Sequence, residues 1–242
     1  MPRKLGQHFL RDATVLARIA EAACPSRVGT LLEIGPGRGA LTAHLMPSCD
    51  RLVSIEIDHD FIAPLKIRFP TLELVEADVL AVDLNSFEAT VVVGNLPYYI
   101  TSPIIERVLE MEGLKSAVFL IQREVGERIA ARHGKSDYGY LSAITQLIAD
   151  VELLFTVPAT AFAPPPKVES AVIRLTPKPS RPANFEAVKR FLSICFQHKR
   201  KTLRNNLRLL YPEIENRAEA GLRAEQLPVQ DLVALMDRLI GA

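Results

Sequence analysis

A buried strand that runs straight into a glycine-rich turn constrains the fold of this chain more than any other stretch. Residues 30–34 (Thr-Leu-Leu-Glu-Ile) have the composition of a buried strand. Gly35-Pro36-Gly37-Arg38-Gly39-Ala40 follows at once, ahead of a predicted helix over residues 41–45. Glycines at a strand-to-helix turn let the backbone approach a ligand closely, at the crevice where open α/β sheets bind nucleotides. The stretch therefore predicts an α/β fold that binds a nucleoside-type cofactor at this turn.

The glycine turn does not identify the cofactor by itself, because with Ala40 it also satisfies the dinucleotide fingerprint G-x-G-x-x-A. Glu56 closes the second predicted strand (residues 52–55) about 20 residues further on, where an acidic side chain binds ribose hydroxyls in either cofactor class. Asp78 follows the third predicted strand (residues 72–75), and we expect it to accept a hydrogen bond from the amino group of a cofactor adenine. These residues leave NAD and S-adenosylmethionine as alternatives.

Strands and helices alternate as far as about residue 150, which predicts a mainly parallel sheet with helices on both faces. The further elements predicted here are strands at 90–94 and 117–121 and helices at 13–23, 61–69, 102–112, 124–131 and 140–150. The pattern then changes, because residues 151–155 and 168–175 enclose a proline-rich loop and have the composition of a strand pair. We expect this pair to end the sheet in antiparallel orientation.

The residues after the fourth predicted strand, Asn95-Leu96-Pro97-Tyr98, carry the chemistry that we expect. The side-chain oxygen of Asn95 and the main-chain carbonyl of Leu96 can each accept one hydrogen of an exocyclic amine. Pro97 stiffens the turn, and Tyr98 offers a face for stacking on a flat base. Two such acceptors outside the ring plane would localise the delocalised lone pair of an adenine amine and direct it at an electrophile. The alternative is a tight turn with Tyr98 in the core, and Phe162, in the proline-rich loop, is either a core plug or a second aromatic wall for the base.

Basic charge is concentrated toward the C-terminus. The net charge of the chain is +1, but residues 180–242 carry 11 Lys and Arg against 7 Asp and Glu, which puts this part at +4 and the rest at −3. Residues 177–182 (Pro-Lys-Pro-Ser-Arg-Pro) have the composition of a semi-rigid linker. Basic side chains beyond it at helical spacing, together with two near the N-terminus, predict binding to nucleic-acid phosphates, with a solvated basic face as the alternative. They are Lys199, Arg200, Lys201, Arg204 and Arg208, with Arg3 and Lys4.

Composition also argues against two classes of protein. The 242 residues are 48% hydrophobic and can bury a real core, yet no stretch reaches the roughly 18 apolar residues of a membrane span. The first six residues lead into no hydrophobic signal segment, so we expect a cytoplasmic protein. Cys24, Cys49 and Cys195 lie far apart, without a C-x-x-C pair or neighbouring histidines, so we expect reduced thiols and no metal site.

Taken in order, five segments of the chain resemble the ribosomal RNA adenine dimethyltransferases, most closely those of the kasugamycin-sensitivity type, which act on the small subunit. The segments are Gly6–Leu10, Glu33–Gly39, Asn95–Tyr98, Phe162–Ser170 and Lys199–Leu207. The resemblance spans nearly the whole chain and implies S-adenosylmethionine, not NAD, as cofactor. It also implies a Rossmann-like class I methyltransferase domain in residues 1–177, whose seven-stranded, mainly parallel sheet has an antiparallel last strand, and a small all-α RNA-binding domain in residues 183–242.

The resemblance further implies roles for single residues. The implied cofactor-binding residues are His8, Leu10, Gly35, Gly37, Glu56, Asp78 and Asn95. The implied catalytic residues are Asn95, Leu96, Pro97, Tyr98 and Phe162, with the rings of Tyr98 and Phe162 on either side of the target adenine. Position 8 is Asn in many members of the family and His in this chain.

The activity implied by the resemblance is dimethylation of the 6-amino group of two adjacent adenosines near the 3′ end of 16S ribosomal RNA, in ribosome biogenesis, with S-adenosylhomocysteine as product. The amine would attack the sulfonium methyl group in line, without a dedicated general base. We expect a monomer whose partner is ribosomal RNA in the small subunit or its precursor, with no metal. The alternatives are a small-subunit assembly factor that acts mainly by binding, a large-subunit enzyme of the erythromycin-resistance type, and a nicotinamide oxidoreductase.

Overall fold

A computed structural model describes residues 8–241 of the chain, which fold into two compact units. The first unit comprises the chain up to Gly126 together with Glu152–Pro177, and the second comprises Glu127–Val151 and the chain from Lys178 onward. The unit boundary at residues 177 and 178 falls in the predicted linker, whereas residues 127–151 group with the C-terminal part. The predicted functional division into 1–177 and 183–242 stays a prediction.

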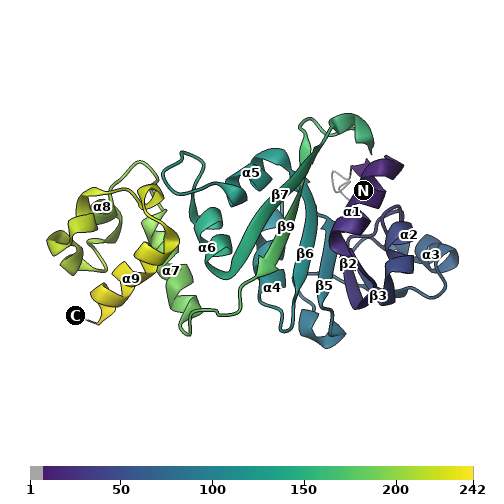
Figure 1. Cartoon of the computed structure of the whole chain (residues 1–242), viewed down its shortest axis with the longest axis horizontal. Coiled ribbons are helices and arrows are strands. Elements are labelled where there is room, and N and C mark those ends of the chain that lie inside the picture. The colour runs from purple at the N-terminus through teal and green to yellow at the C-terminus, as the bar shows by residue number, and fades with distance from the viewer. Residues whose placement is uncertain (1–7, 242) are drawn as a thin grey trace. The chain divides into compact units, whose positions relative to one another are not determined.

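A seven-stranded sheet forms the centre of the first unit, with the strand order β4-β3-β2-β5-β6-β9-β7 (Figure 1). The strands are β2 (Val28–Ile34), β3 (Cys49–Glu56), β4 (Glu73–Glu76), β5 (Val91–Asn95), β6 (Ser116–Gln122), β7 (Ala149–Val157) and β9 (Ser170–Pro177). Strands β4, β3, β2, β5 and β6 pair in parallel, and β9 runs antiparallel to β6. The predicted class I methyltransferase-like sheet is therefore confirmed.

Helix α1 (Ala13–Ala23) precedes β2, and α2 (Thr42–Leu45), α3 (His59–Arg68) and α4 (Thr101–Leu109) lie between successive parallel strands of the first unit. Helix α5 (Arg123–Ala130) crosses the division between the units. Shorter 3-10 turns are η1 (Met46–Ser48), η2 (Leu84–Phe87), η3 (Ala159–Ala161), η4 (Pro212–Asn216), η5 (Ala218–Gly221) and η6 (Ala224–Gln226). Two short strands, β1 (Phe9–Leu10) and β8 (Phe162–Ala163), pair antiparallel outside the main sheet.

The core below the glycine turn lies between α1 and one face of the sheet. The Asp12 carboxylate starts α1 by accepting hydrogen bonds from the backbone N–H groups of Thr14 and Val15, at 2.9 and 3.1 Å. One face of α1 then packs on alternate residues of the strands, because successive strand side chains point to opposite faces. The buried partners are Val15, Leu16, Ile19, Ala20 and Ala23 on α1 and Leu31, Val91, Val93, Val118, Leu120 and Val172 on the sheet.

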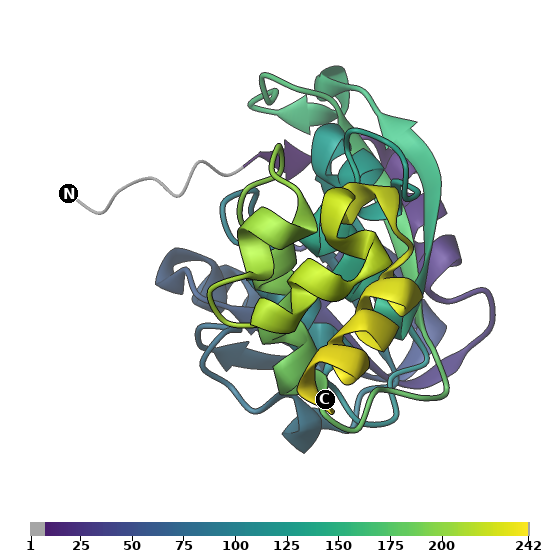
Figure 2. The same ribbon diagram turned by 90° about the vertical axis from the view of Figure 1, so that its left-hand side faces the viewer.

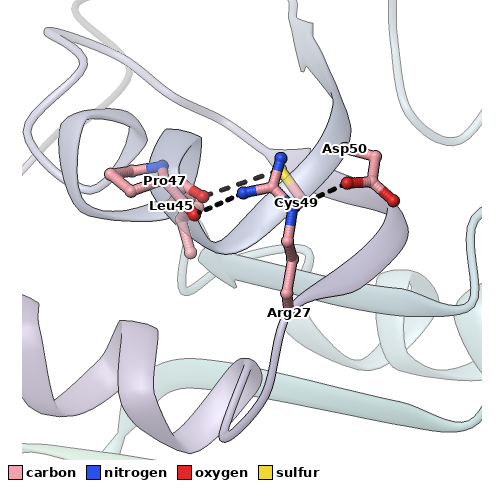
Figure 3. A network of polar contacts seen from close by, with 5 residues as sticks. All are labelled: Arg27, Leu45, Pro47, Cys49 and Asp50. Carbon is pink, nitrogen blue, oxygen red and sulfur yellow. Dashed lines mark hydrogen bonds and ion pairs between the residues drawn. The ribbon is translucent and has the colours of Figure 1, made fainter.

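A network of polar contacts lies at the amino-terminal ends of β2 and β3. Figure 3 shows Arg27, just before β2, donating from Nε to Asp50 Oδ1 at 2.6 Å and from Nη1 to the Pro47 carbonyl at 3.0 Å. In the same network the Cys49 thiol donates to the Leu45 carbonyl at 3.6 Å. All three cysteines are free and buried. These contacts fasten the start of β3 to the turn that follows α2.

The second unit is helical apart from the first residues of β7. Its helices are α6 (Tyr140–Ile148), α7 (Phe185–Cys195), α8 (Leu203–Leu207) and α9 (Val229–Ile240), the last three drawn in green to yellow in Figure 2. Aromatic contacts hold it together: the rings of Tyr138 and Phe196 lie 5.9 Å apart, and those of Phe191 and Tyr211 lie 5.4 Å apart. Of the helices in the described part of the chain, none is long and apolar enough to cross a bilayer.

The predicted helical spacing of the five C-terminal basic residues is wrong. Only Arg204 lies within a helix, α8, while Lys199–Lys201 form a turn and Arg208 is the residue that follows α8. The Asn206 side chain explains the break, because its Nδ2 donates to the Cys195 carbonyl at 2.8 Å and so ends α7. A new helix then starts at Thr202, whose hydroxyl accepts from the Asn205 N–H.

Candidate active site

A cavity of about 860 Å³ opens in the first unit at the carboxyl ends of β2, β3 and β5. This is the edge at which open α/β sheets bind ligands. The cavity is lined by all the predicted catalytic and cofactor-binding residues except Phe162: His8, Leu10, Gly35, Gly37, Glu56, Asp78, Asn95, Leu96, Pro97 and Tyr98. Residues spread over 91 sequence positions thus share one site.

The glycine turn needs its glycines for conformation and for space. Gly35 and Gly37 have φ angles of +69° and +53°, which L side chains rarely adopt. At Gly39, with φ +75°, an added Cβ would lie 2.5 Å from the Phe69 ring and 2.9 Å from Leu65. The first two glycines therefore keep the backbone bare at the cavity wall, while the third allows the turn to pack on α3.

Glu56 ends β3 as a buried carboxylate held by backbone. Its Oε2 accepts from the Gly37 N–H and its Oε1 from the Asp58 N–H, both at 2.9 Å. Burial raises the pKa of Glu56, and the backbone hydrogen bonds lower it in part. Each carboxylate oxygen has a second lone pair, so Glu56 can still accept from ligand hydroxyls. Asp78 has a similar arrangement, since its Oδ1 accepts from the Leu80 N–H at 2.9 Å.

Glu33 is a cavity-lining carboxyl group for which the sequence predicted no role. It is 1% exposed, and its Oε2 accepts from the Thr42 hydroxyl at 2.7 Å and the Ser54 hydroxyl at 2.9 Å. Burial raises the pKa of Glu33 to about 7, although both hydroxyls lower it. An acidic residue inside an otherwise apolar strand was the sequence signal that could have identified it.

The Asn95 amide is held by the residue before the N-terminal strand. Its Nδ2 donates to the main-chain carbonyl of His8 at 3.1 Å, so Oδ1 is the amide atom available to accept a hydrogen bond from a ligand. Leu96 is buried, and its N–H donates to the Leu120 carbonyl of β6 at 3.0 Å. The Asn95 side chain is therefore held by the residue just before β1, and the Leu96 backbone is held by the sheet.

Tyr98 is held at both its hydroxyl and its ring. The hydroxyl shares a 2.8 Å hydrogen bond with Oγ of Ser170, which is fully buried on β9. Burial raises the pKa of Tyr98, and the hydrogen bond to Ser170 lowers it in part. The ring lies 6.0 Å from the ring of His8, with 28° between the two planes. His8 is also anchored, because its Nδ1 lies 2.9 Å from the Pro164 carbonyl.

Phe162 occupies the core and not the cavity wall. It is 4% exposed, pairs with Leu10 across β1 and β8, and belongs to the hydrophobic cluster beneath α1. The sequence left two interpretations of Phe162 open, a core residue or a wall for the base, and the structure places it in the core. Its assignment as a wall for the target base stays a prediction.

The predicted RNA-binding residues of the second unit are exposed: Lys199, Arg200, Lys201, Arg204 and Arg208. Arg204 is partly neutralised by Glu215, 3.5 Å from its Nε. The other two predicted residues, Arg3 and Lys4, lie outside the described part of the chain. Three exposed arginines also line the cavity in the first unit: Arg11, Arg38 and Arg68.

Comparisons with known proteins agree with this geometry. Residues 1–239 match the family described as ribosomal RNA adenine dimethylase. A ribosomal RNA small subunit methyltransferase A of Koribacter versatilis is 40% identical over 266 residues, covering 98% of this chain and 93% of that protein. The crystal structure of a dimethyladenosine transferase from Plasmodium falciparum superimposes with a TM-score of 0.84 at 28% identity, covering 97% and 98% of the two chains. The 23S rRNA methyltransferase ErmE gives 0.70 at 29% identity, covering 96% and 99%.

Proposed function

The chain belongs to the ribosomal RNA adenine dimethylase family, and we propose that it dimethylates the 6-amino group of two adjacent adenosines near the 3′ end of 16S ribosomal RNA. Its cofactor is S-adenosylmethionine, which supplies an electrophilic methyl group on a sulfonium sulfur. Relatives at about 40% identity that are named for the small subunit favour that substrate over large-subunit RNA. The proposal includes a monomer that acts in the cytoplasm on the small subunit or its precursor.

The residues around the cavity fit a nucleoside cofactor. The proposal assigns Glu56 to the ribose hydroxyls and Asp78 to the adenine amine, since each carboxylate keeps acceptor capacity beyond its backbone contacts. Ile57, 56% exposed although it is apolar, lies in the cavity wall beside them and suits one face of the cofactor adenine. The bare backbone at Gly35 and Gly37 suits the methionine part, with His8 and Leu10 across from it.

The orientation of the Asn95 amide carries the mechanistic proposal. With Nδ2 committed to the His8 carbonyl, Oδ1 accepts one hydrogen of the adenine amine, and the Leu96 carbonyl accepts the other. Acceptance from outside the ring plane withdraws the nitrogen lone pair from the ring and directs it at the methyl group. Catalysis then comes from positioning and alignment, and the proton leaves to water after transfer.

The same pair of acceptors is compatible with two successive transfers. After the first transfer the amine keeps a single hydrogen, so one acceptor suffices to orient the lone pair for the second. Asn95 is half-buried and lines the cavity. We therefore expect both methyl groups to enter the same nitrogen.

Incubation with ribosomal subunits and isotope-labelled S-adenosylmethionine tests the proposal. Mass spectrometry of the digested RNA should find N6,N6-dimethyladenosine in 16S RNA and at most traces in 23S RNA. Dimethylation confined to 23S RNA would contradict the substrate assignment. If subunits mature normally with a methylation-dead variant but not without the protein, the assembly alternative is favoured.

The RNA-binding part of the proposal has its own test. Replacing Lys199, Arg200 and Lys201 by Ala should weaken RNA binding and lower the slope of log affinity against log salt by about 0.7–0.9 for each phosphate that the variant no longer neutralises. Replacing Glu213, an exposed acidic residue of the same unit, by Gln is the control and should not reduce that slope. An unchanged slope in the triple variant would show that the three residues are merely solvated.

A further inference from the structure

We propose that Leu209 and Leu210 make a salt-independent apolar contact with RNA, by lying on the sugars of the shallow minor groove of an RNA helix. We call these two residues the leucine tip. They lie in the second unit and do not line the cavity. The inference rests on the proposed function, and it adds a second kind of RNA contact to the phosphate binding expected of the basic residues.

The leucine tip exposes more apolar surface than its composition requires. Leu209 is 89% exposed and Leu210 is 65% exposed. Of the exposed large apolar residues in the described chain, only these two are neighbours in sequence. Single exposed leucines are ordinary on protein surfaces, whereas a contiguous apolar patch is typical of a binding surface.

The fold holds the leucine tip in this exposed position. Leu203 and Leu207 of α8 are fully buried. The chain continues past them as a helical turn, since the N–H groups of Leu210 and Tyr211 donate to the Leu207 carbonyl at 3.0 and 2.8 Å. The Tyr211 ring then packs on Phe191, with 5.4 Å between the ring centroids. Because both sides of the tip are anchored, a partner that binds it has little further ordering to impose.

The charges near the leucine tip favour an anionic partner. Residues 198–211 contain five Lys and Arg and no Asp or Glu. Arg208 adjoins the tip, and the basic turn Lys199–Lys201 lies beyond the other end of α8, a helix about 7 Å long. Arg204 is partly neutralised by Glu215. An apolar tip flanked by cations on both sides is therefore complementary to RNA, the polyanion that the proposed function supplies.

The minor groove of an RNA helix suits a short apolar protrusion. In A-form RNA this groove is wide and shallow and displays the riboses, whereas the major groove is deep and narrow. Leucine side chains can cover the C–H surface of the sugars there, while Arg208 and the basic turn bind phosphates. The minor groove of B-DNA is only about 6 Å wide and about 7.5 Å deep. We therefore expect the leucine tip to distinguish an RNA helix from a DNA helix.

A protein partner fits this surface less well. The cores of protein interfaces are depleted of charged residues, whereas the leucine tip is small and lies in a strongly basic segment. Ile240, at the end of α9, offers a comparison within the same unit. It is 58% exposed, and its neighbour Arg238 is paired with Glu219. Ile240 therefore has the apolar exposure without the basic surroundings.

Binding of the full chain to protein-free 16S ribosomal RNA, measured over a range of salt concentrations, tests the inference. In the double variant Leu209→Ser, Leu210→Ser the affinity should fall about 5- to 50-fold at every salt concentration, because salt does not screen an apolar contact. The slope of log affinity against log salt should stay that of wild type. Replacing the three residues of the basic turn by Ala should instead lower that slope. Ile240→Ser is the matched control and should change neither quantity.

Two short duplexes of the same sequence, one of RNA and one of DNA, test the assignment to the minor groove. The double variant should lose affinity for the RNA duplex by a similar factor and for the DNA duplex by less than about twofold, since phosphate contacts remain on both. The unfolding midpoint of the double variant in urea should equal that of wild type, because both side chains are exposed. An equal loss on RNA and DNA would contradict the minor-groove contact.

Three results with 16S RNA would overturn the inference. One is an unchanged affinity of the double variant, and the second is a lower salt slope in that variant, which would mean that the substitutions disturb the basic turn. The third is a loss seen with assembled subunits and not with protein-free RNA, which would assign the leucine tip to a protein of the subunit. A wild-type protein that binds RNA as expected but methylates no ribosomal RNA adenine would overturn the proposed function and leave this contact in place.

Discussion

Polar side chains are bound differently at the two ends of the same parallel strands. At the amino ends, polar groups satisfy one another: Arg27 binds Asp50 and the Pro47 carbonyl, and Arg51 binds both oxygens of Glu73 at 2.8 Å and the Phe87 carbonyl at 2.9 Å. At the carboxyl ends, Glu56 accepts from backbone N–H groups at both oxygens and Asn95 donates to the His8 carbonyl, and both line the cavity with lone pairs that can still accept.

This difference separates polar groups that stabilise from polar groups that function. The pairs at the amino ends bind one another and nearby carbonyls, and none of their four side chains lines the cavity. A side chain held by backbone at one atom is oriented in advance, so binding a ligand costs little further ordering. The carboxyl edge therefore has acceptors that are oriented in advance and can still bind a ligand. Substitutions at the two edges test this contrast, from the largest expected effect to the smallest.

Removing the amide at the carboxyl edge should have the largest effect. In Asn95→Ala the amine loses one of its two acceptors, so the single-turnover rate of methylation should fall about 10²- to 10³-fold, as for other preorganised groups in water-excluded sites. The unfolding midpoint in urea should change little, because Asn95 is only half-buried. A rate within tenfold of wild type, with cofactor still bound, would contradict the amide mechanism.

Glu33 should make the stability of the protein depend on pH. Burial raises its pKa to about 7, so the folded protein binds this proton more tightly than the unfolded chain. The contribution is fully present below the unfolded pKa, near 4.5, and is lost as pH rises toward 7. The full change is on the order of 3 kcal/mol.

The pH dependence is measured by urea unfolding of the apo protein at pH 5, 6, 7 and 8. Glu33→Gln keeps an acceptor for Thr42 and Ser54 but cannot ionise, so its free energy of unfolding should fall less than that of wild type over this range. Glu73→Gln, at a half-exposed glutamate of the amino edge, is the matched control. If the free energy of unfolding depends on pH in the same way in wild type and Glu33→Gln, Glu33 is charged in the folded state over this range.

Two strand glycines provide the next comparison between the edges. At Gly94, near the carboxyl end of β5, an added Cβ would lie 2.7 Å from the Ile34 carbonyl, so the strands must shift. Gly94→Ala should cost about 1–3 kcal/mol in the free energy of unfolding and also slow methylation, because Asn95 is the next residue. At Gly29, near the amino end of β2, nothing lies within 4 Å of the added atom. Gly29→Ala should leave the free energy of unfolding unchanged or slightly raised. An equal loss of unfolding free energy in Gly94→Ala and Gly29→Ala would contradict the expected difference between the two edges.

Much of the sheet was predictable from sequence because its strands are continuous apolar runs, as expected for parallel strands buried on both faces. The helix at 13–23 was predicted at its observed bounds because Asp12 caps it. The strand at 151–155 was predicted too short, since β7 runs from Ala149 to Val157 and its residues between the two buried ends are all exposed or half-buried. The basic segment at 198–208 was wrongly taken as regularly helical, because Asn206 ends α7 through a hydrogen bond to a residue 11 positions earlier in the chain.

The site was predictable as a set of residues but not as a set of contacts. Strand-end positions follow from the alternation of elements, which brings Glu56, Asp78 and Asn95 to one edge. No sequence pattern gives the hydrogen bond from Asn95 to the His8 carbonyl, since 87 positions separate them. The burial of Phe162 likewise depends on the pairing of β1 with β8, two strands too short to predict.

The smallest effect is expected at the amino edge, from the Arg27–Asp50 pair. Both side chains are more than half exposed, at 61% and 68%, so solvent screens their attraction and ordering two side chains offsets much of it. A double-mutant cycle with Arg27→Ala and Asp50→Ala should give a coupling free energy below about 1 kcal/mol that falls further in 1 M salt. Methylation should be unchanged in all three variants, because neither residue lines the cavity. A coupling free energy of several kcal/mol would mean that the pair contributes strongly to stability, and a loss of methylation would mean that the amino edge contributes to function. Either result would remove the contrast between the two ends.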